Sequence, residues 1–126
     1  MSQSSPFAVI ERLHDATNRH DLDAFVACFA EDYDSQQPVY PERAFVGSAQ
    51  VRKNWSRLFE GMPDLHVELL RSSVTGDEVW GEWEWRGTWT DGALFHIRGV
   101  MIYGIRNGQI AWARLYTEPV ADQGFR

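Results

Sequence analysis

Few side chains in this sequence combine a reactive group with a position from which it could act on a bound molecule. His14 lies on the apolar side of a helical pattern, and a histidine can change charge near neutral pH. Asp32 and Asp34 flank Tyr33, and paired carboxylates can share a proton or orient water. Tyr103 could donate a hydrogen bond to a carbonyl group. The candidate catalytic residues are therefore His14, Tyr33, Asp34 and Tyr103.

Each candidate also has an interpretation without chemistry. His14 could be a hydrogen-bonded histidine at the edge of its helix, and acidic residues in turns are usually solvated. Tyr103 and Trp55 could be core aromatic residues whose polar atoms are satisfied. Glu82 and Glu84 would become candidates only if their strand turned them into the interior, where a buried carboxylate is typical of a functional site.

The sequence lacks the usual marks of metal, phosphate and nucleophile sites. His20, His66 and His96 show no metal-ligand spacing with a fourth partner, so we expect no metal. Cys28 is the single cysteine, which excludes an intramolecular disulfide and a cysteine-based zinc cluster. There is no glycine-rich phosphate loop and no nucleophile elbow. We expect no cofactor.

The charge balance limits the partners. Of 126 residues, 18 are acidic and 12 are Lys or Arg, which gives a net charge of −6 and argues against nucleic acid and an anionic membrane surface. The basic cluster Arg52, Lys53 and Arg57 is therefore expected to be a solvated helix face. No apolar run approaches the roughly 20 residues that span a bilayer, and the first residues do not form a leader. We expect one cytoplasmic domain over residues 1–126, with its core at about 7–119.

Three amphipathic helices are predicted in the N-terminal half, where apolar residues recur at helical spacing. The first has Ser5 as its cap and Pro6 as its first residue. The second is capped by Asp21 and is expected to carry apolar positions as far as Phe29. The third is capped by Ser48 and stops at 61, a glycine followed by a proline two residues later.

The rest of the chain predicts strands. A strand-like segment at 33–37 and a loop without regular structure at 39–46 lie between the last two helices. The C-terminal half predicts an antiparallel meander with hairpin turns at 91–92 and 107–108, which read Asp-Gly and Asn-Gly. Its four strands are expected at roughly 64–75, 78–90, 93–106 and 109–118.

These strands are too long to stay flat. Residues 93–106 would extend about 45 Å at ~3.3 Å per residue, whereas a compact domain of this size is only about 36 Å across. Glycines within the strands mark the bends, at Gly81, Gly87, Gly99 and Gly104. The pattern predicts an α+β fold in which three N-terminal helices pack on a strongly curved, mostly antiparallel β-sheet, as a cone-shaped α+β barrel.

The register of the second and third long strands decides which side chains line the cone. A two-residue loop at 91–92 would put Glu82 and Glu84 beside Met101 in the interior. A three-residue loop that begins one residue earlier places Glu84 opposite Arg98 and turns the tryptophans inward. We favour the second register because it keeps the charges solvated and paired.

In the favoured register the interior is an aromatic, mostly apolar pocket. A three-residue loop at 106–108 would likewise turn one face of the last strand inward. The side chains of that face are Ala111, Ala113, Leu115 and Thr117. The expected ligand-binding residues are Phe25, Phe29, Gln37, Trp55, Phe59, Trp83, Trp85, Met101, Leu115 and Thr117. The pocket would take a small apolar ligand.

Six short segments of the sequence form a familiar series along the chain. They are Asn-Arg-His-Asp-Leu-Asp-Ala-Phe at 18–25, Ala-Glu-Asp at 30–32, Trp-Glu-Trp-Arg-Gly-Thr at 83–88, Arg-Gly-Val-Met-Ile-Tyr at 98–103, Asn-Gly-Gln-Ile at 107–110 and Arg-Leu-Tyr at 114–116. The series resembles SnoaL-like proteins of the nuclear transport factor 2-like superfamily. The resemblance covers roughly residues 7 to 119 and implies a cone-shaped fold. The superfamily includes polyketide cyclases, ketosteroid isomerases, limonene epoxide hydrolase-like enzymes and members that only bind or associate.

The chain departs from these relatives at their acid and base positions. The resemblance puts Gln37 at the general base of the isomerases and Leu13 at their oxyanion-stabilising tyrosine. Met101 takes the place of the partner aspartate of that tyrosine, and also of the cyclases' histidine. Leu115 takes the place of the last-strand aspartate of the cyclases and epoxide hydrolases. None of these side chains exchanges a proton near neutral pH.

Three functions remain open on the sequence. The first is a pocket for a small hydrophobic molecule that lacks the acid and base residues of the relatives. The second is a cofactor-independent cyclase, isomerase or hydratase with a different catalytic set. The third is an interaction module whose cavity is filled by its own side chains.

The outer face of the sheet is expected to expose three aromatic residues, Trp80, Trp112 and Tyr116. Exposed aromatic residues on a sheet predict a homodimer through that face.

Overall fold

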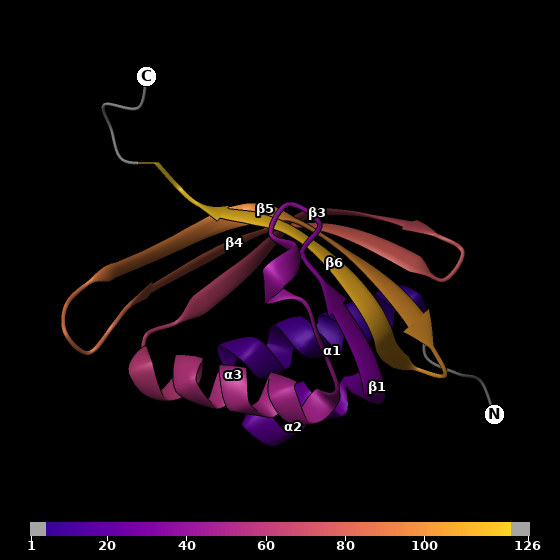
Figure 1. Cartoon of the computed structure of the whole chain (residues 1–126), viewed down its shortest axis with the longest axis horizontal. Coiled ribbons are helices and arrows are strands. Elements are labelled where there is room, and N and C mark those ends of the chain that lie inside the picture. Colours follow the sequence, from indigo (N-terminus) through magenta and orange to yellow (C-terminus); the bar gives the residue numbers. More distant parts are fainter. Residues whose placement is uncertain (1–4, 122–126) are drawn as a thin grey trace.

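The computed structural model describes residues 5–121, which form helices on one side of a six-stranded sheet that curls over them (Figure 1). This is the α+β arrangement that the sequence predicts. The elements are α1 (Pro6–Asn18), α2 (Leu22–Ala27), β1 (Phe29–Gln36), the 3₁₀ turn η1 (Pro41–Arg43), β2 (Phe45–Val46), α3 (Ser48–Gly61), β3 (His66–Thr75), β4 (Glu78–Thr88), β5 (Leu94–Arg106) and β6 (Gln109–Pro119).

The first two helices begin at the predicted caps. The Ser5 hydroxyl accepts a hydrogen bond from the backbone N–H of Ala8 at 3.2 Å, and the Asp21 carboxylate accepts one from the N–H of Ala24 at 3.1 Å. The third helix begins one residue earlier than a Ser48 cap requires, because Gly47 is its N-cap. Gly47 has φ 106°, which favours glycine at that position.

The segment between α2 and α3 is more regular than the sequence predicts. Phe29 does not extend the second helix but opens β1, which is longer than the expected strand at 33–37. The expected loop at 39–46 contains η1 and β2. Both differences arise from tertiary pairing, since β1 lies between β2 and β6 in the sheet.

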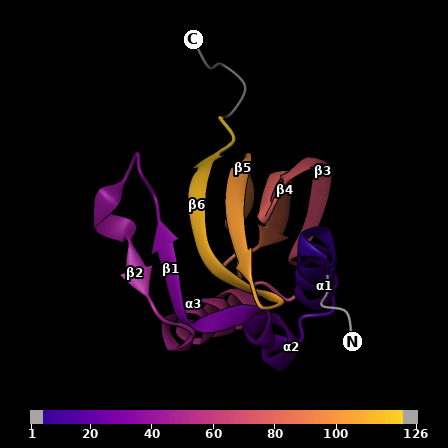
Figure 2. The ribbon, with the colours of Figure 1, turned by 90° about the vertical axis from the view of Figure 1, so that its right-hand side faces the viewer.

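The sheet is open, with the strand order β2-β1-β6-β5-β4-β3. The β1–β6 pair is parallel and the other pairs are antiparallel. Figure 2 shows β2 and β3 at opposite edges, with α1 beside β3. The sheet curves strongly but does not close into a barrel, and the helices cover its concave face instead (Figure 1). None of the helices within residues 5–121 has the length and apolar character needed to cross a bilayer.

The favoured register of β4 and β5 is confirmed. The backbone N–H of Trp89 donates to the carbonyl of Ala93 at 2.9 Å, which closes a three-residue loop, and Glu84 pairs with Arg98. Trp83 is consequently buried, with 3% of its surface exposed. Glu84 lies on the opposite face, where its carboxylate accepts hydrogen bonds from Arg86 and His96 at 2.9 and 2.7 Å.

The β5–β6 hairpin differs from the prediction in detail. Its loop has two residues, Asn107 and Gly108, both with positive φ as an Asn-Gly turn requires, rather than the three expected. A β-bulge between the pairs of Gly104 and Ile105 then shifts the register by one residue. Ala111 is the extra residue, and it lies on the outer face, so the inward placement predicted for it is wrong.

Candidate functional site

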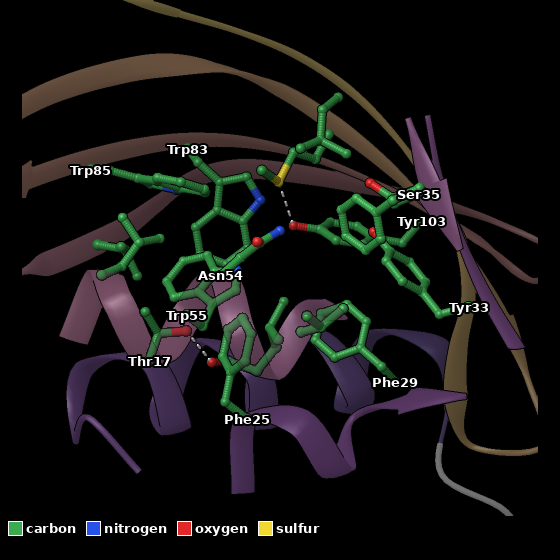
Figure 3. A pocket seen from close by; sticks show the side chains of 18 of the residues that line it. Thr17, Phe25, Phe29, Tyr33, Ser35, Asn54, Trp55, Trp83, Trp85 and Tyr103 are labelled. Carbon is green, nitrogen blue, oxygen red and sulfur yellow. Dashed lines mark hydrogen bonds between the residues drawn. The ribbon is translucent and has the colours of Figure 1, made fainter. Parts of the chain in front are cut away.

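A cavity of about 410 Å³ lies between the concave face of the sheet and the helices (Figure 3). This volume falls in the range of roughly 300–1,000 Å³ that is typical of small-molecule sites. Its wall draws on α1, α2, α3 and all six strands, so distant parts of the chain meet there. Its aromatic lining consists of Phe25, Phe29, Tyr33, Phe45, Trp55, Trp83, Trp85 and Tyr103.

The aromatic residues support one another across elements. Phe25 of α2 packs on Trp55 of α3 with ring centroids 4.3 Å apart, and on Phe29 of β1 at 5.3 Å. Trp55 in turn meets Trp85 of β4 edge-on at 5.3 Å. Aromatic pairs at such distances stabilise each other beyond their simple burial. The helical side of the cavity is therefore firmly connected to the sheet.

Two phenols, Tyr33 of β1 and Tyr103 of β5, project into the cavity from strands that flank β6. Burial raises the pKa of Tyr33 to about 12, although hydrogen bonding from Ser35 opposes the change. Burial also raises the pKa of Tyr103 well above its ordinary value, again against a smaller opposing effect, from the Trp83 N–H. Both phenols are therefore neutral near pH 7. They can donate hydrogen bonds but cannot act as bases there.

Three hydrogen-bond donors point toward one another at the centre of the cavity (Figure 3). The Tyr103 hydroxyl donates to the Met101 sulfur at 3.0 Å. The Trp83 indole N–H is near enough to Tyr103 to oppose the rise of its pKa, but it makes no hydrogen bond of good geometry with any described residue. The amide oxygen of Asn54 accepts a hydrogen bond from Gln50 at 2.9 Å, which leaves its NH₂ group for the cavity.

The mouth of the cavity is polar. Gln37 lines it together with two exposed arginines, Arg43 and Arg57. The Arg43 guanidinium lies over the Tyr40 ring, 4.0 Å from its centroid. Arg57 therefore belongs to the cavity wall and not only to a solvated helix face, which corrects the sequence-based interpretation. No Asp, Glu or His is among the described residues that line the cavity.

Most of the predicted ligand-binding residues lie in the cavity wall. These are Phe25, Phe29, Gln37, Trp55, Trp83, Trp85, Met101 and Leu115. Phe59 and Thr117 are not part of that wall. Phe59 stacks instead on His20, with ring centroids 4.8 Å apart. Thr117 pairs with Gly99 farther along β6, beyond the enclosed part of the sheet.

The structure separates the four candidate catalytic residues. Tyr33 and Tyr103 line the cavity, whereas His14 and Asp34 do not. The His14 ring nitrogen lies 3.0 Å from the carbonyl oxygen of Val67, and the ring meets Trp83 edge-on at 5.5 Å. His14 therefore lies behind the Trp83 indole and takes no part in the lining.

Asp34 lies on the outer side of β1, where its carboxylate accepts a hydrogen bond from the Gln36 side chain at 3.0 Å. Side chains alternate along a strand, so the inward direction of Tyr33 and Ser35 requires the outward direction of Asp34. Asp32 is also on the outer side, paired with Arg106 at 2.7 Å. The two carboxylates are therefore remote from the cavity.

Sequence reasoning missed several polar lining residues. Ser35 could have been found, because it shares the strand face of Tyr33. Asn54 follows no pattern that separates it from other polar residues of α3. Thr17 of α1 also reaches the wall, but its hydroxyl is already committed to the carbonyl of Leu13 at 2.6 Å.

Solved structures of the same fold come from several bacteria. IdmH from Streptomyces antibioticus, a candidate polyketide cyclase, is 20% identical with a TM-score of 0.77, and the match covers 91% of this chain and 93% of IdmH. RV0760c from Mycobacterium tuberculosis, solved in complex with estradiol-17beta-hemisuccinate, is 19% identical with a TM-score of 0.77 over 90% and 94% of the two chains. At these identities the similarity establishes the fold.

A third similar structure is a protein with a ketosteroid isomerase-like fold from Catenulispora acidiphila, in complex with trimethylamine. It is 18% identical, with a TM-score of 0.74 over 90% of this chain and 86% of that one.

No curated protein matches the sequence. The model of the SnoaL-like domain matches residues 10–113, most of the chain. The protein is therefore a member of the SnoaL-like domain family.

Proposed function

We propose that this protein binds a small, mostly apolar molecule inside its cavity and lacks the acid and base residues of the enzymes it resembles. The observation that carries the proposal is a cavity of about 410 Å³ with aromatic walls and no carboxylate or imidazole in its described lining. A free volume of this size favours a ligand over a cavity filled by the protein's own side chains.

The proposed ligand is a rigid ring system. Flat apolar faces suit the rings of Trp55 and Trp85, and an apolar body gains roughly 25 cal/mol for each Å² removed from water. A steroid derivative is the ligand of the similar RV0760c, and a polyketide is the substrate class named for IdmH. Both classes are compatible with the cavity proposed for this chain.

Binding can be tested by titrating the protein with estradiol and with 9-fluorenone while following tryptophan fluorescence. We expect saturable quenching, because several of the tryptophans lie in the cavity wall. Leu115→Trp should reduce the affinity at least about tenfold by occupying the cavity. Val74→Trp is the matched control, since it adds the same side chain at an exposed position of β3. Equal affinities of the two variants would contradict the proposal.

An enzymatic function is the alternative that the two buried phenols keep open. Tyr33 and Tyr103 are neutral donors in the cavity and could protonate or polarise a bound ligand, in a cyclase-, isomerase- or hydratase-type reaction. Such a reaction would have to proceed without a protein carboxylate or imidazole as the base. Product analysis after incubation with the ligands that bind, in the wild type and in Tyr33→Phe, distinguishes this alternative from binding alone.

We also propose that the protein is a homodimer through the outer face of the sheet. Trp80 and Tyr116 are exposed there, and they line a groove together with Trp112. Sedimentation velocity should give the mass of two chains, and Tyr116→Glu should shift it to one. Val39→Glu, at another exposed apolar residue, should leave the mass unchanged. A single-chain mass for the wild type at high concentration would contradict the dimer.

A further inference from the structure

The indole nitrogen of Trp83 is the one buried side-chain polar atom without a hydrogen-bond partner in the described part of the chain. The residue is 3% exposed, and an N–H group buried without an acceptor is unfavourable. The backbone preserves the space around this nitrogen. A Cβ atom at Gly81, the residue two positions earlier on the same face of β4, would lie 2.9 Å from Trp83 Nε1.

The neighbouring donors are also poorly engaged. The Tyr103 hydroxyl donates to the sulfur of Met101, which is a weak acceptor. The amide of Asn54 has its oxygen occupied by Gln50, so its NH₂ group is the part that remains for the cavity. Figure 3 shows the Asn54 amide, the Trp83 nitrogen and the Tyr103 oxygen directed toward the same region. Donors thus converge there from α3, β4 and β5.

We propose that Trp83, Tyr103 and Asn54 together bind a carbonyl oxygen of the ligand. This inference rests on the proposed function, because it names the polar group that the apolar ligand carries. A carbonyl oxygen accepts two or more hydrogen bonds and brings no proton that needs an acceptor. A hydroxyl group brings such a proton, whereas the groups that converge here are donors, and the Asn54 oxygen already accepts a hydrogen bond from Gln50. The site therefore selects a ketone over the corresponding alcohol.

The three donors are neutral, which limits the charge of the ligand group that they can bind. A carboxylate at this depth would lose its hydration without a compensating positive charge. The two arginines of the cavity lining, Arg43 and Arg57, are exposed at the mouth instead. The central donors therefore suit an uncharged oxygen, and any acidic group of the ligand belongs at the mouth.

The test compares three ring compounds of one shape, 9-fluorenone, 9-fluorenol and fluorene, which carry a carbonyl, a hydroxyl and a methylene group at the same carbon. We expect fluorenone to bind at least about tenfold tighter than fluorene, since each hydrogen bond contributes about fivefold or more in affinity and at least two are formed. Fluorenol should fall between the two. The carbonyl stretch of bound fluorenone should shift to lower frequency relative to that in an apolar solvent.

Conservative variants identify the donors. Tyr103→Phe removes only the hydroxyl and should lower the preference for fluorenone over fluorene about fivefold. Trp83→Phe should do the same and should reverse part of the infrared shift. Trp80→Phe is the matched control, because it removes an indole N–H from the outer face and should leave the preference unchanged. Asn54→Leu tests the third donor in the same way.

The outcomes separate the two proposals. Equal affinity for fluorenone and fluorene, with an unshifted carbonyl stretch, would overturn the donor site while the apolar pocket stood. Binding of none of the three compounds would overturn the pocket and the donor site together. The infrared measurement on the wild type is decisive even if Trp83→Phe fails to fold.

Discussion

Two tryptophans three residues apart on β4 experience opposite environments. Trp80 lies on the outer face, 46% exposed, with its indole N–H 3.4 Å from the Glu78 carboxylate. Trp83 lies on the inner face, 3% exposed, with its N–H directed into the cavity and unpaired among the described residues. The contrast shows that position on the sheet, and not residue type, decides whether an indole is exposed on the surface or buried in the cavity wall.

The largest expected difference between the two faces concerns stability. Trp83→Ala removes a buried ring that packs on His14 and should lower the free energy of unfolding by about 3–5 kcal/mol. Trp80→Ala should cost less than about 1 kcal/mol in the monomer, because its ring is half exposed. Urea denaturation of both variants checks the difference. Similar losses would mean that the inner face contributes no more to the core than the outer face.

The buried phenols should make the inner face sensitive to alkali. The folded-state pKa of Tyr33 is about 12 and its ordinary value is 10.0, so the stability linked to this residue is complete below pH 10 and is lost as the pH rises toward 12. This difference in pKa between the folded and unfolded states corresponds to roughly 3 kcal/mol in the free energy of unfolding. In the Tyr33→Phe variant, the free energy of unfolding should therefore fall less steeply between pH 9 and pH 12, a range that includes both pKa values. An unchanged slope would contradict the assignment.

On the outer face of the sheet, the linked stability should be lost in acid and not in alkali. A hydrogen bond from His96 lowers the pKa of Glu84 below its ordinary value, with Arg86 and Arg98 contributing, against a smaller opposing effect of burial. The stability linked to Glu84 is therefore present above the ordinary value of 4.5 and is lost as the pH falls through the lower, folded-state pKa. Glu84→Gln should remove this small acid-dependent loss, and thermal unfolding at a series of pH values measures it. His96→Gln should weaken it in the same direction.

The smallest effect concerns the mouth of the cavity. Arg57→Ala should weaken binding of fluorenone-4-carboxylate about two- to fivefold, as for an exposed ion pair, and leave the affinity for fluorenone unchanged. Arg114→Ala removes an arginine from the outer face and is the control. Titrations at low and high salt provide a second check, because the effect should diminish with added salt. Equal losses for both ligands would place Arg57 in the packing of the wall and not in charge recognition.

The sequence predicts the inner face of β4 correctly because its charges alternate with its tryptophans. Glu82, Glu84 and Arg86 share one face and are unfavourable in a core, so Trp83 and Trp85 must face inward. The same reasoning, applied to β1, would have directed Asp34 outward once Tyr33 was placed inside. Chemistry alone groups Tyr33 with Asp34 as catalytic candidates, but the structure places them on opposite faces of β1.

Other features depend on contacts that no local pattern carries. The β-bulge that turns Ala111 outward compensates for the two-residue turn at 107–108, and neither the turn nor the bulge alone gives the final register. The contribution of Asn54 to the cavity follows from how α3 lies under the sheet, and nearby residues of α3 such as Lys53 and Ser56 are equally polar. Periodicity therefore predicts the walls of the cavity better than the polar groups within it.

The parallel pairing of β1 with β6 has a consequence for how the chain folds. The Gln109 side chain donates to the carbonyl of Phe29, eighty residues away, so this contact must wait for nearly the whole chain to be synthesised. Pairings of such long range form slowly, since a large loop must close before they contribute. Tyr33 and Ser35 on one strand meet Ala113 and Leu115 on the other only at that moment. A nascent chain would thus form its helices and central hairpins first and complete the cavity last.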